Sequence, residues 1–305
     1  MTATPLRGTT KDGKLSPWLT VPARELNRCR KVIASTKYEP HYKGHAGIYT
    51  GGLNGAYFVE ILERYPNGTV LIRNLYDVGK IKCPQVQTPI EAELLYPLLR
   101  GRSVARWRSA PANHVLIVQD PKSQRGYPEK WLQQTHPLTW AYLKKFEELL
   151  RDRKAFKKFF NPQKDPFYSM YAISDYTFAP YKVVWMDISA TVKATVVAGS
   201  GGNDMPLPEH TVMFLTTNSE DEAHYVAAIL NSQPVDTVVA GYIVDNHLST
   251  HPIENVVIPK FDTTKATHKR LASLSRKAHR AATQGDDEGV DNAEQAINET
   301  VENLW

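Results

Sequence analysis

Short segments rich in valine and isoleucine recur along most of this chain, and each is bounded by glycine or proline. Such segments are typical of β-strands. The clearest pair, residues 56–63 and 69–73, flanks a Pro66-Asn67-Gly68 turn and predicts a β-hairpin. Further strands are expected at residues 114–118, 181–185, 191–198, 211–215 and 255–258. We therefore expect the β-structure to be assembled from most of the chain.

Helical patterns interrupt the predicted strands. A helix is expected from Thr135, with an apolar face made of Leu138, Tyr142, Phe146 and Leu149. Ser219, followed three residues later by Glu222, forms the capping-box pattern of a helix start. Further helices are expected over residues 21–35 and beyond Thr267. The sequence thus predicts a mixed α/β (α+β) fold: a mixed β-sheet with peripheral helices and a C-terminal helical segment.

Charge is unevenly distributed along the chain. The formal net charge is +5, but residues 285–305 carry seven acidic side chains and no lysine or arginine. Removing those seven negative charges leaves +12 on residues 1–284. A body this basic attracts polyanions, and nucleic acid bound to it would be released by salt.

The composition also indicates the compartment. No stretch approaches the roughly 18 uncharged apolar residues that span a bilayer, and residues 1–17 are polar where a secretory signal would be apolar. Two cysteines, Cys29 and Cys83, provide no disulfide framework and agree with a reducing environment. We expect a cytoplasmic protein with no membrane partner.

Residues 91–107 read EAELLYPLLRGRSVARW, an apolar segment that changes into three arginines around a glycine. The apolar half, residues 94–99, can enter a core and leave Arg100, Arg102 and Arg106 directed outward. Rigid guanidinium groups suit a phosphate backbone or a guanine edge. A solvated arginine cluster beside a buried turn fits the same residues equally well.

Catalytic patterns are largely missing. Residues 165–168 (DPFY) differ by one residue from the Asp-Pro-Pro-Tyr sequence with which amino-methyltransferases hold a flipped adenine. That sequence should end a buried parallel strand, whereas residues 157–164 (KKFFNPQK) cannot form one. The glycine-rich turn for S-adenosylmethionine is also missing. We therefore predict no catalytic residue in this chain.

Phosphate-loop and metal signatures are equally weak. Residues 51–55 (GGLNG) lack the lysine and the serine or threonine of a P-loop. The histidines and cysteines that might form a zinc site include no closely spaced cysteine pair; they are Cys29, His41, His45 and Cys83. We predict no metal site.

Six segments resemble, in their order along the chain, a known family. They are residues 50–57 (TGGLNGAY), 95–107 (LYPLLRGRSVARW), 166–171 (PFYSMY), 176–185 (YTFAPYKVVW), 223–232 (AHYVAAILNS) and 257–262 (VIPKFD). The chain from about Tyr38 onward resembles the C-terminal target-recognition region of adenine-N6 DNA methyltransferases. It is similar to the TaqI-like specificity domain of such enzymes and of fused restriction-modification enzymes.

The resemblance implies a mixed α/β module that docks on duplex DNA opposite a separate methyltransferase domain and reads the target sequence, chiefly in the major groove. It suggests an N-terminal lead-in segment (1–36), a DNA target-recognition domain (37–262) and a C-terminal helical segment (263–305). The expected partners are double-stranded DNA and a methyltransferase catalytic subunit or domain. S-adenosylmethionine is expected on that separate domain, and no cofactor in this chain.

Six candidate DNA-binding residues follow from the basic character and the resemblance. They are Asn54, Arg100, Arg102, Arg106, Lys182 and Lys260. Arginine side chains can hydrogen-bond guanine, lysine side chains can contact phosphate, and asparagine can pair with adenine. Arg100 and Arg102 match a family motif, whereas Lys182 matches one near the protein core, where a structural role is the alternative.

Two other functions fit the sequence. One is a remnant or interaction protein that assembles with, or competes against, an intact methyltransferase through the acidic helix at residues 290–305. The other is a self-sufficient methyltransferase that uses residues 165–168. Co-purification with a catalytic subunit tests the first, and calorimetry with S-adenosylmethionine tests the second.

Overall fold

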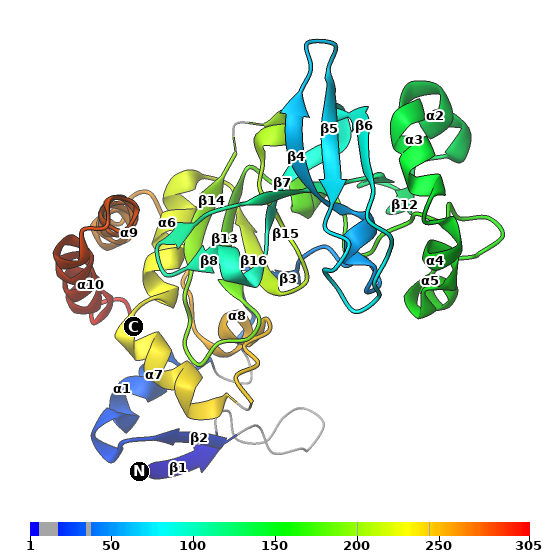
Figure 1. The fold of residues 1–305 in the computed structure, drawn as a ribbon. Coiled ribbons are helices and arrows are strands. Elements are labelled where there is room, and N and C mark those ends of the chain that lie inside the picture. Colours follow the sequence, from blue (N-terminus) through cyan, green and yellow to red (C-terminus); the bar gives the residue numbers. More distant parts are fainter. Residues whose placement is uncertain (6–17, 35–37, 200, 244) are drawn as a thin grey trace.

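The structure is a computed structural model that describes residues 1–5, 18–34, 38–199, 201–243 and 245–305. Two main β-sheets lie side by side, and helices cover the two outer ends of the molecule (Figure 1). The predicted mixed α/β class is confirmed, including the C-terminal helical segment. In the described part of the chain, no helix combines the length and apolar character needed to cross a membrane.

The larger sheet has six strands in the order β15-β7-β10-β4-β5-β6. Their bounds are Leu207–Pro208 (β15), Leu95–Leu99 (β7), Asn113–Leu116 (β10), Phe58–Arg64 (β4), Thr69–Asn74 (β5) and Gln87–Glu91 (β6). Neighbours are antiparallel except β15 and β7, which run parallel. The predicted hairpin is confirmed as β4 and β5, which project from the sheet in Figure 1. Gly68 takes a φ of 82° at its tip, a conformation that glycine adopts without strain.

Four short helices flank the outer edge of this sheet. They are Glu129–Thr135 (α2), Pro137–Lys144 (α3), Glu147–Asp152 (α4) and Lys154–Phe159 (α5). Tyr142 and Phe146 of the predicted apolar face are buried, but Leu138 is 37% exposed, and the single helix expected from Thr135 is divided into α3 and α4. Phe146, with ψ of 8°, lies at the break, and its side chain is buried in the core. Tertiary packing has overridden a continuous helical pattern here.

The second sheet has four antiparallel strands in the order β14-β13-β16-β3. They are Thr195–Ala198 (β14), Tyr181–Met186 (β13), Val212–Thr217 (β16) and Gly44–Ala46 (β3). Helix α6, Glu220–Leu230, packs on this sheet. It begins at the predicted cap, where Ser219 Oγ accepts a hydrogen bond from the Glu222 amide at 3.2 Å.

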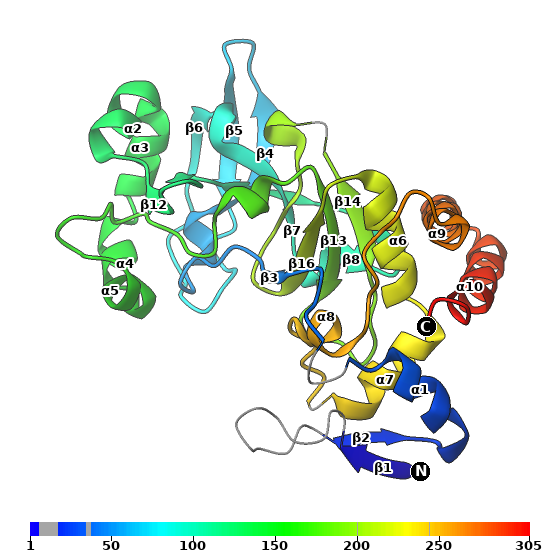
Figure 2. The same ribbon diagram turned by 180° about the vertical axis from the view of Figure 1, so that it is seen from behind.

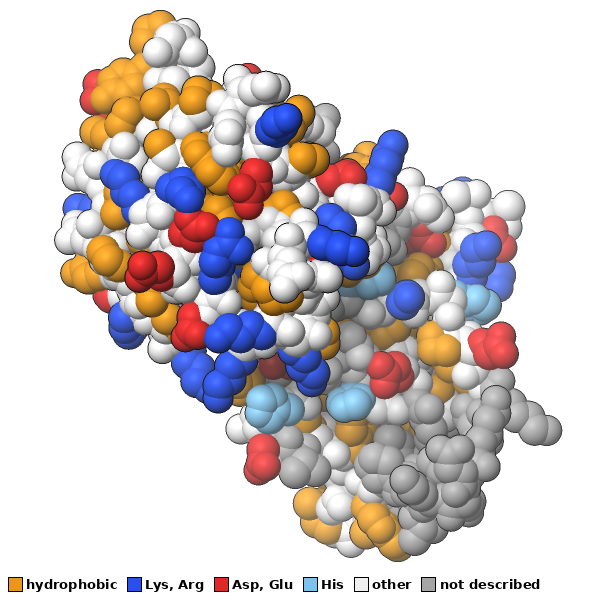
Figure 3. Space-filling model, turned by 90° about the vertical axis from the view of Figure 1, so that its right-hand side faces the viewer, with side chains coloured by type: hydrophobic (Ala, Val, Ile, Leu, Met, Phe, Trp, Pro, Cys, Tyr) orange, Lys and Arg blue, Asp and Glu red, His pale blue; other side chains and the backbone are white. Residues whose placement is uncertain are grey.

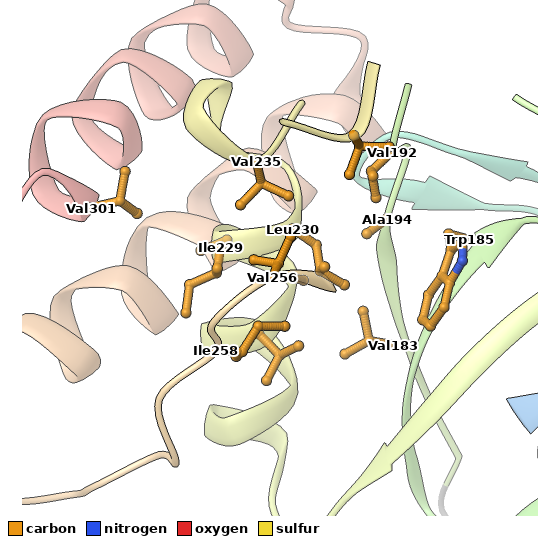
Figure 4. Packing of buried hydrophobic residues seen from close by; sticks show 14 of the residues in the cluster. Val183, Trp185, Val192, Ala194, Ile229, Leu230, Val235, Val256, Ile258 and Val301 are labelled. Atoms are coloured by element: carbon orange, nitrogen blue, oxygen red, sulfur yellow. The ribbon is translucent and has the colours of Figure 1, made fainter. Parts of the chain in front are cut away.

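Helices α7, Gln233–Tyr242, α9, Ala266–Gln284, and α10, Asp287–Val301, extend this half of the molecule. Figure 4 shows their shared core, which extends from Val183 of β13 past Leu230 and Val235 to Val301 of α10. Figure 2 shows α9 and α10 beyond α6, away from the six-stranded sheet. Burial of this apolar face fixes the helices on the sheet.

The same core also receives residues from near the N-terminus. Strands β1, Thr2–Pro5, and β2, Trp18–Val21, form a hairpin, and helix α1, Leu26–Val32, follows. Leu19 and Val32 join the core of the second sheet. Elements from all three predicted segments thus share one core, and the proposed division of the chain stays a prediction.

Further predicted elements differ from the structure, and the strand expected at residues 191–198 is shortened to β14, Thr195–Ala198. The helix expected over residues 21–35 is shortened to α1, preceded by a 3-10 turn at Ala23–Glu25, and residues 35–37 lie outside the described part. The strand expected at residues 255–258 is reduced to one bridge between Val256 and Ile33. Its apolar residues are buried by helix packing rather than by pairing in a sheet.

A buried histidine pair joins α6 to α9. His224 Nδ1 lies 3.0 Å from Ser275 Oγ, and His279 Nε2 accepts the Val196 amide at 2.9 Å. Burial, followed by the nearby His279, lowers the pKa of His224 to about 3. Burial, opposed by the Ser275 carbonyl, lowers the pKa of His279 to about 4. Both rings are therefore neutral in the folded protein at neutral pH.

Acidification is expected to destabilise this helix interface. In the unfolded chain these histidines take up protons near pH 6.5. In the folded chain His279 is protonated only near pH 4 and His224 only near pH 3. Stability is thus unaffected above pH 6.5 and falls below it, by up to about 1.4 kcal/mol per pH unit for each histidine. Urea unfolding between pH 7 and pH 4 measures this slope. His279→Gln should flatten it, whereas exposed His247→Gln should leave it unchanged.

Candidate nucleic-acid interface

Strand β7 ends at Leu99, and the next four residues form what we call the arginine turn, Arg100 to Ser103. Arg100 is extended, and Gly101–Ser103 make one turn of 3-10 helix. The Gly101 amide donates a hydrogen bond to Thr211 Oγ1 at 2.9 Å, and the Thr211 hydroxyl donates to the Glu209 carboxylate. Because β15 runs parallel to β7, residues far apart in sequence meet here and hold the turn in place.

The two arginines of this turn lie in different environments. The Arg100 guanidinium lies 6.0 Å from the centre of the Phe58 ring, and its Nε has no acceptor within the described residues. Burial, followed by repulsion from Arg102, lowers the pKa of Arg100, and this effect is opposed by Glu209 and Asp77. Arg102 is exposed and makes no ion pair with the described part of the chain. The buried Arg100 Nε is closed to an outside ligand, so a bidentate acceptor would meet Arg102 and the terminal nitrogens of Arg100.

A buried carboxylate and a histidine adjoin the turn. The Glu209 side chain is only 2% exposed, and its Oε2 lies 2.6 Å from His210 Nδ1. This separation suits an ion pair when the imidazole is protonated, although the angle is not that of a hydrogen bond. The His210 ring meets the Tyr49 ring edge-on at 5.3 Å. A rigid, partly buried polar cluster therefore supports the arginines.

Arg106 lies in an internal ion-pair cluster instead. It occupies the two-residue loop between β8, Val104–Ala105, and β9, Arg108–Ser109. Its guanidinium binds the Asp236 carboxylate at 3.0 Å and also contacts the Glu294 carboxylate and the Asn231 carbonyl. These partners use its donors, so we leave Arg106 out of the proposed interface.

Trp107 completes the same loop. Its φ of 63° is unusual for a bulky residue, although two-residue hairpin loops favour positive φ. The buried indole donates a hydrogen bond from Nε1 to Glu294 Oε1 at 2.6 Å. Arg106 and Trp107 thus attach helix α10 to the β8–β9 hairpin.

Lys182 and Asn54 are also enclosed. The Lys182 side chain is fully buried, its Nζ donates to the Ala179 carbonyl at 2.7 Å, and burial lowers its pKa to about 7. Asn54 is 5% exposed, and its Oδ1 accepts a hydrogen bond from the Thr50 hydroxyl. Neither side chain is accessible to a duplex in this conformation, which agrees with the structural alternative for Lys182.

Lys260 is exposed, in the loop between α8, His251–Asn255, and α9. Its chain neighbours Ile258 and Phe261 pack in the core of the four-stranded sheet. Within the described part of the chain, no hydrogen bond or ion pair joins the Lys260 side chain to the arginine turn. The structure therefore brings Arg100 and Arg102 together and leaves Lys260 as a separate cation.

Residues 165–168 adopt a turn after α5, not the end of a parallel strand. The Asp165 carboxylate accepts a hydrogen bond from the Asn161 amide at 2.7 Å and pairs with Arg125 at 3.1 Å. Phe167 and Tyr168 are fully buried. The carboxylate therefore stabilises its own turn. Among the described residues, no group of three or more His, Cys, Asp or Glu side chains could hold a metal ion.

Sequence reasoning missed a basic surface on the four helices α2 to α5. Figure 3 shows lysine and arginine side chains gathered on this side, with acidic side chains between them. The exposed cations are Lys130, Lys144, Lys145, Arg151, Lys154, Lys157, Lys158 and Lys164. Some are neutralised, because Arg151 pairs with Glu147 and Lys157 with Asp152. The lysine pairs at residues 144–145 and 157–158 are the sequence feature that could have predicted this basic surface.

The chain is similar to part of a methyltransferase. No family model matches the sequence. Over 144 residues, 47% of this chain, it is 30% identical to the type II methyltransferase M.NspV of Nostoc sp.. The match spans 28% of that methyltransferase, so the chain corresponds to well under two thirds of this relative. The sequence is thus homologous to a segment of a type II methyltransferase.

The fold resembles that of one solved restriction-modification enzyme. The type IIL restriction-modification enzyme MmeI, solved in complex with DNA, superposes with a TM-score of 0.52 and 11% identity, over 88% of this chain and 33% of MmeI. At this identity the likeness concerns the fold alone. The superposition with the type IIG restriction endonuclease BpuSI covers 68% of this chain and 26% of BpuSI. Its TM-score of 0.31 is too low to support an argument.

Proposed function

We propose that this chain is the DNA sequence-recognition module of an adenine-N6 DNA methyltransferase or restriction-modification system. It binds duplex DNA and positions a separate S-adenosylmethionine-dependent catalytic domain. The observation that carries the proposal is the arginine turn, where the partly buried Arg100 and the exposed Arg102 follow the end of β7 and the turn is held by Thr211 and Glu209. Homology to a segment of a methyltransferase and the likeness of fold to MmeI support a place in a methyltransferase or restriction-modification system.

Electrostatics support duplex DNA as the ligand. Residues 1–284 carry a formal charge of +12, and the cations of α2 to α5 add a second basic area to the arginine turn. Lysine and arginine on a surface bind phosphates in a salt-dependent manner, whereas base edges are read by a few fixed donors. The hydrogen-bonded arginine turn suits the reading of base edges, and the lysines of α2 to α5 suit the binding of phosphates.

Arg102→Ala is expected to weaken binding of the pure chain to its target duplex by about 1–3 kcal/mol if the guanidinium contacts a base. If it contacts phosphate, affinity should fall for every duplex and the salt slope should decrease by about one. Fluorescence anisotropy at several salt concentrations separates these results. Exposed Arg270 on α9 is the control, and Arg270→Ala should change neither affinity nor slope. Unchanged binding by the Arg102 variant would show that the turn only braces the fold.

The catalytic partner is tested separately. The proposal expects this chain to bind DNA without methylating it, and to support methylation when the partner catalytic domain is added. Calorimetry with S-adenosylmethionine should show no binding to the chain alone. Heat of binding in that experiment would favour a self-sufficient methyltransferase, and co-purification with the partner without DNA binding would favour an interaction protein.

A further inference from the structure

An aromatic cavity of about 430 Å³ lies between α5, the β11–β12 hairpin and the segment that follows Phe167. Strands β11 and β12 are Gln119–Asp120 and Arg125–Gly126. We call this cavity the aromatic pocket; its main lining residues are Tyr49, Arg125, Phe159, Phe160, Tyr171 and Tyr176. Its volume falls within the roughly 300–1,000 Å³ of small-ligand sites. The contacts of the proposed recognition module described above do not use it.

The aromatic rings offer an open stacking surface. Phe159 is 59% exposed, although it ends a helix rich in lysine. Its ring centre lies 5.8 Å from that of Tyr171, which also meets Phe160 at 5.0 Å and Tyr49 at 5.7 Å. Leaving a large apolar ring in water is unfavourable, and an exposed apolar patch beside polar groups is typical of a binding site. Phe159 thus presents its ring to solvent, with the Lys158 ammonium 5.1 Å from the ring centre, whereas Tyr171 is partly buried among the other rings.

Polar groups stand beside these rings. The Arg125 guanidinium lies 5.4 Å from the Phe160 ring centre, and its side chain is 53% exposed. Gln124, also in the lining, has a φ of 56°, and Ala172 on the other side has a φ of 55°. Positive φ at non-glycine residues costs energy and is concentrated at ligand sites. Amide and guanidinium donors therefore accompany the aromatic surface.

A chain of side-chain contacts links the pocket to the arginine turn. Tyr49 lines the pocket and contacts the His210 ring at 5.3 Å. His210 follows Glu209, which accepts the hydrogen bond of Thr211 that supports the turn. On the other side lies α5, whose exposed cations include Lys154 and Lys158. A polyanion held by the lysines of α5 would therefore lie beside the pocket.

We propose that the aromatic pocket receives one unstacked nucleobase of the bound DNA. The proposal rests on the function proposed above and adds a second site to it. The base stacks on the exposed ring of Phe159 and borders Tyr171, whose ring plane stands at 72° to that of Phe159. Its polar edge meets Gln124 and Arg125, and the adjoining phosphate lies near the lysines of α5. Arg125 pairs with Asp165 and still leaves its side chain 53% exposed, so the mouth of the pocket favours a ligand with a polar edge over a purely apolar one. Paired bases inside a duplex present no free face to the rings.

The test compares two duplexes of the same sequence, one fully paired and one with a single extrahelical 2-aminopurine. The full-length chain should bind the second duplex tighter, on the order of 10-fold, because stacking of a base on aromatic side chains is favourable. The 2-aminopurine fluorescence should be quenched on binding. Deoxyadenosine monophosphate is included as a free competitor, to distinguish a base presented by DNA from a soluble nucleotide.

Variants assign the effect to the pocket. Phe159→Ala should remove the preference and the quenching while leaving affinity for the paired duplex unchanged, and Phe159→Tyr should retain both. Ile188, which is 58% exposed and outside the pocket lining, provides the matched control, and Ile188→Ala should behave like the wild type. Circular dichroism of each variant confirms that it is folded.

The outcomes separate the two proposals. Binding of the paired duplex without preference for the extrahelical base overturns the pocket assignment and leaves the recognition function intact. A preference that survives Phe159→Ala places the base elsewhere and also overturns it. Deoxyadenosine monophosphate that competes at the affinity of the bulged duplex would make the pocket a nucleotide site instead. Absence of binding to either duplex overturns both proposals.

Discussion

Replacing Arg153 by methionine is expected to lower the free energy of unfolding by roughly 3–5 kcal/mol. Arg153 is fully buried, and its guanidinium donates hydrogen bonds to carbonyls of the surrounding loops. The acceptors are Leu150 at 2.9 Å, Thr50 at 2.7 Å, Phe167 at 2.7 Å and Ser169 at 3.0 Å. Methionine fills much of the volume but supplies no donor, and each buried carbonyl left without one costs about 1–3 kcal/mol.

Arg153 also explains how the region around the aromatic pocket is assembled. Its bonds connect the Thr50 turn, helix α4 and the segment after Pro166, and its guanidinium lies 5.7 Å from the centre of the Tyr57 ring. Gly51, with φ of 76°, brings its backbone close to the arginine: a Cβ there would lie 3.1 Å from Arg153 Cδ. Loops without regular pairing are therefore fixed by one side chain.

Arg151 provides the matched control for this prediction. It lies two residues earlier, is 43% exposed and pairs with Glu147. Arg151→Met should change stability by less than about 1 kcal/mol, because exposed ion pairs contribute little. Arg153→Lys should not restore stability, since an ammonium group cannot reproduce the planar fork. Urea unfolding followed by tryptophan fluorescence measures all three, and equal midpoints for the Arg151 and Arg153 variants would contradict the prediction.

Arg106→Ala is expected to lower the free energy of unfolding by roughly 2–4 kcal/mol without changing the DNA affinity of the folded protein. Removing the guanidinium leaves the carboxylates of Asp236 and Glu294 close together without their cation, and an unpaired buried charge is strongly unfavourable. The side chain is 25% exposed, so the effect should be smaller than for a fully buried pair. Burial already raises the pKa of Asp236, and Arg106 opposes that rise.

Local measurements distinguish this role from DNA binding. Hydrogen exchange should show protection lost along α10, which Arg106 and Trp107 attach through Glu294. Arg108, two residues later and exposed, is the control, and Arg108→Ala should leave stability and α10 unchanged. A double-mutant cycle of Arg106→Ala with Glu294→Gln measures the coupling. Loss of DNA affinity in a fully stable Arg106 variant would return this residue to the proposed interface.

Local sequence patterns were sufficient for several elements. The Asn67-Gly68 turn predicted the β4–β5 hairpin, and Ser219 with Glu222 predicted the start of α6. Both signals depend on residues within a few positions of one another, so no distant contact is needed to form them. The prediction of a strand at residues 255–258 was wrong for the opposite reason. A run of apolar residues can be buried as well by packing against helices as by pairing in a sheet, and distant contacts decide which occurs.

The sequence by itself determined the mixed α/β class, the hairpin, the capped helix and the basic body, because propensity, turn chemistry and net charge are local or additive properties. Only the tertiary structure decided which of the three arginines between residues 100 and 106 are exposed and which are paired. Arg102 is exposed, Arg100 is partly buried beside Phe58, and Arg106 is neutralised by carboxylates more than a hundred residues away. Whether a charged side chain meets solvent or a buried counter-charge depends on which distant segments fold against it, and no local pattern contains that information.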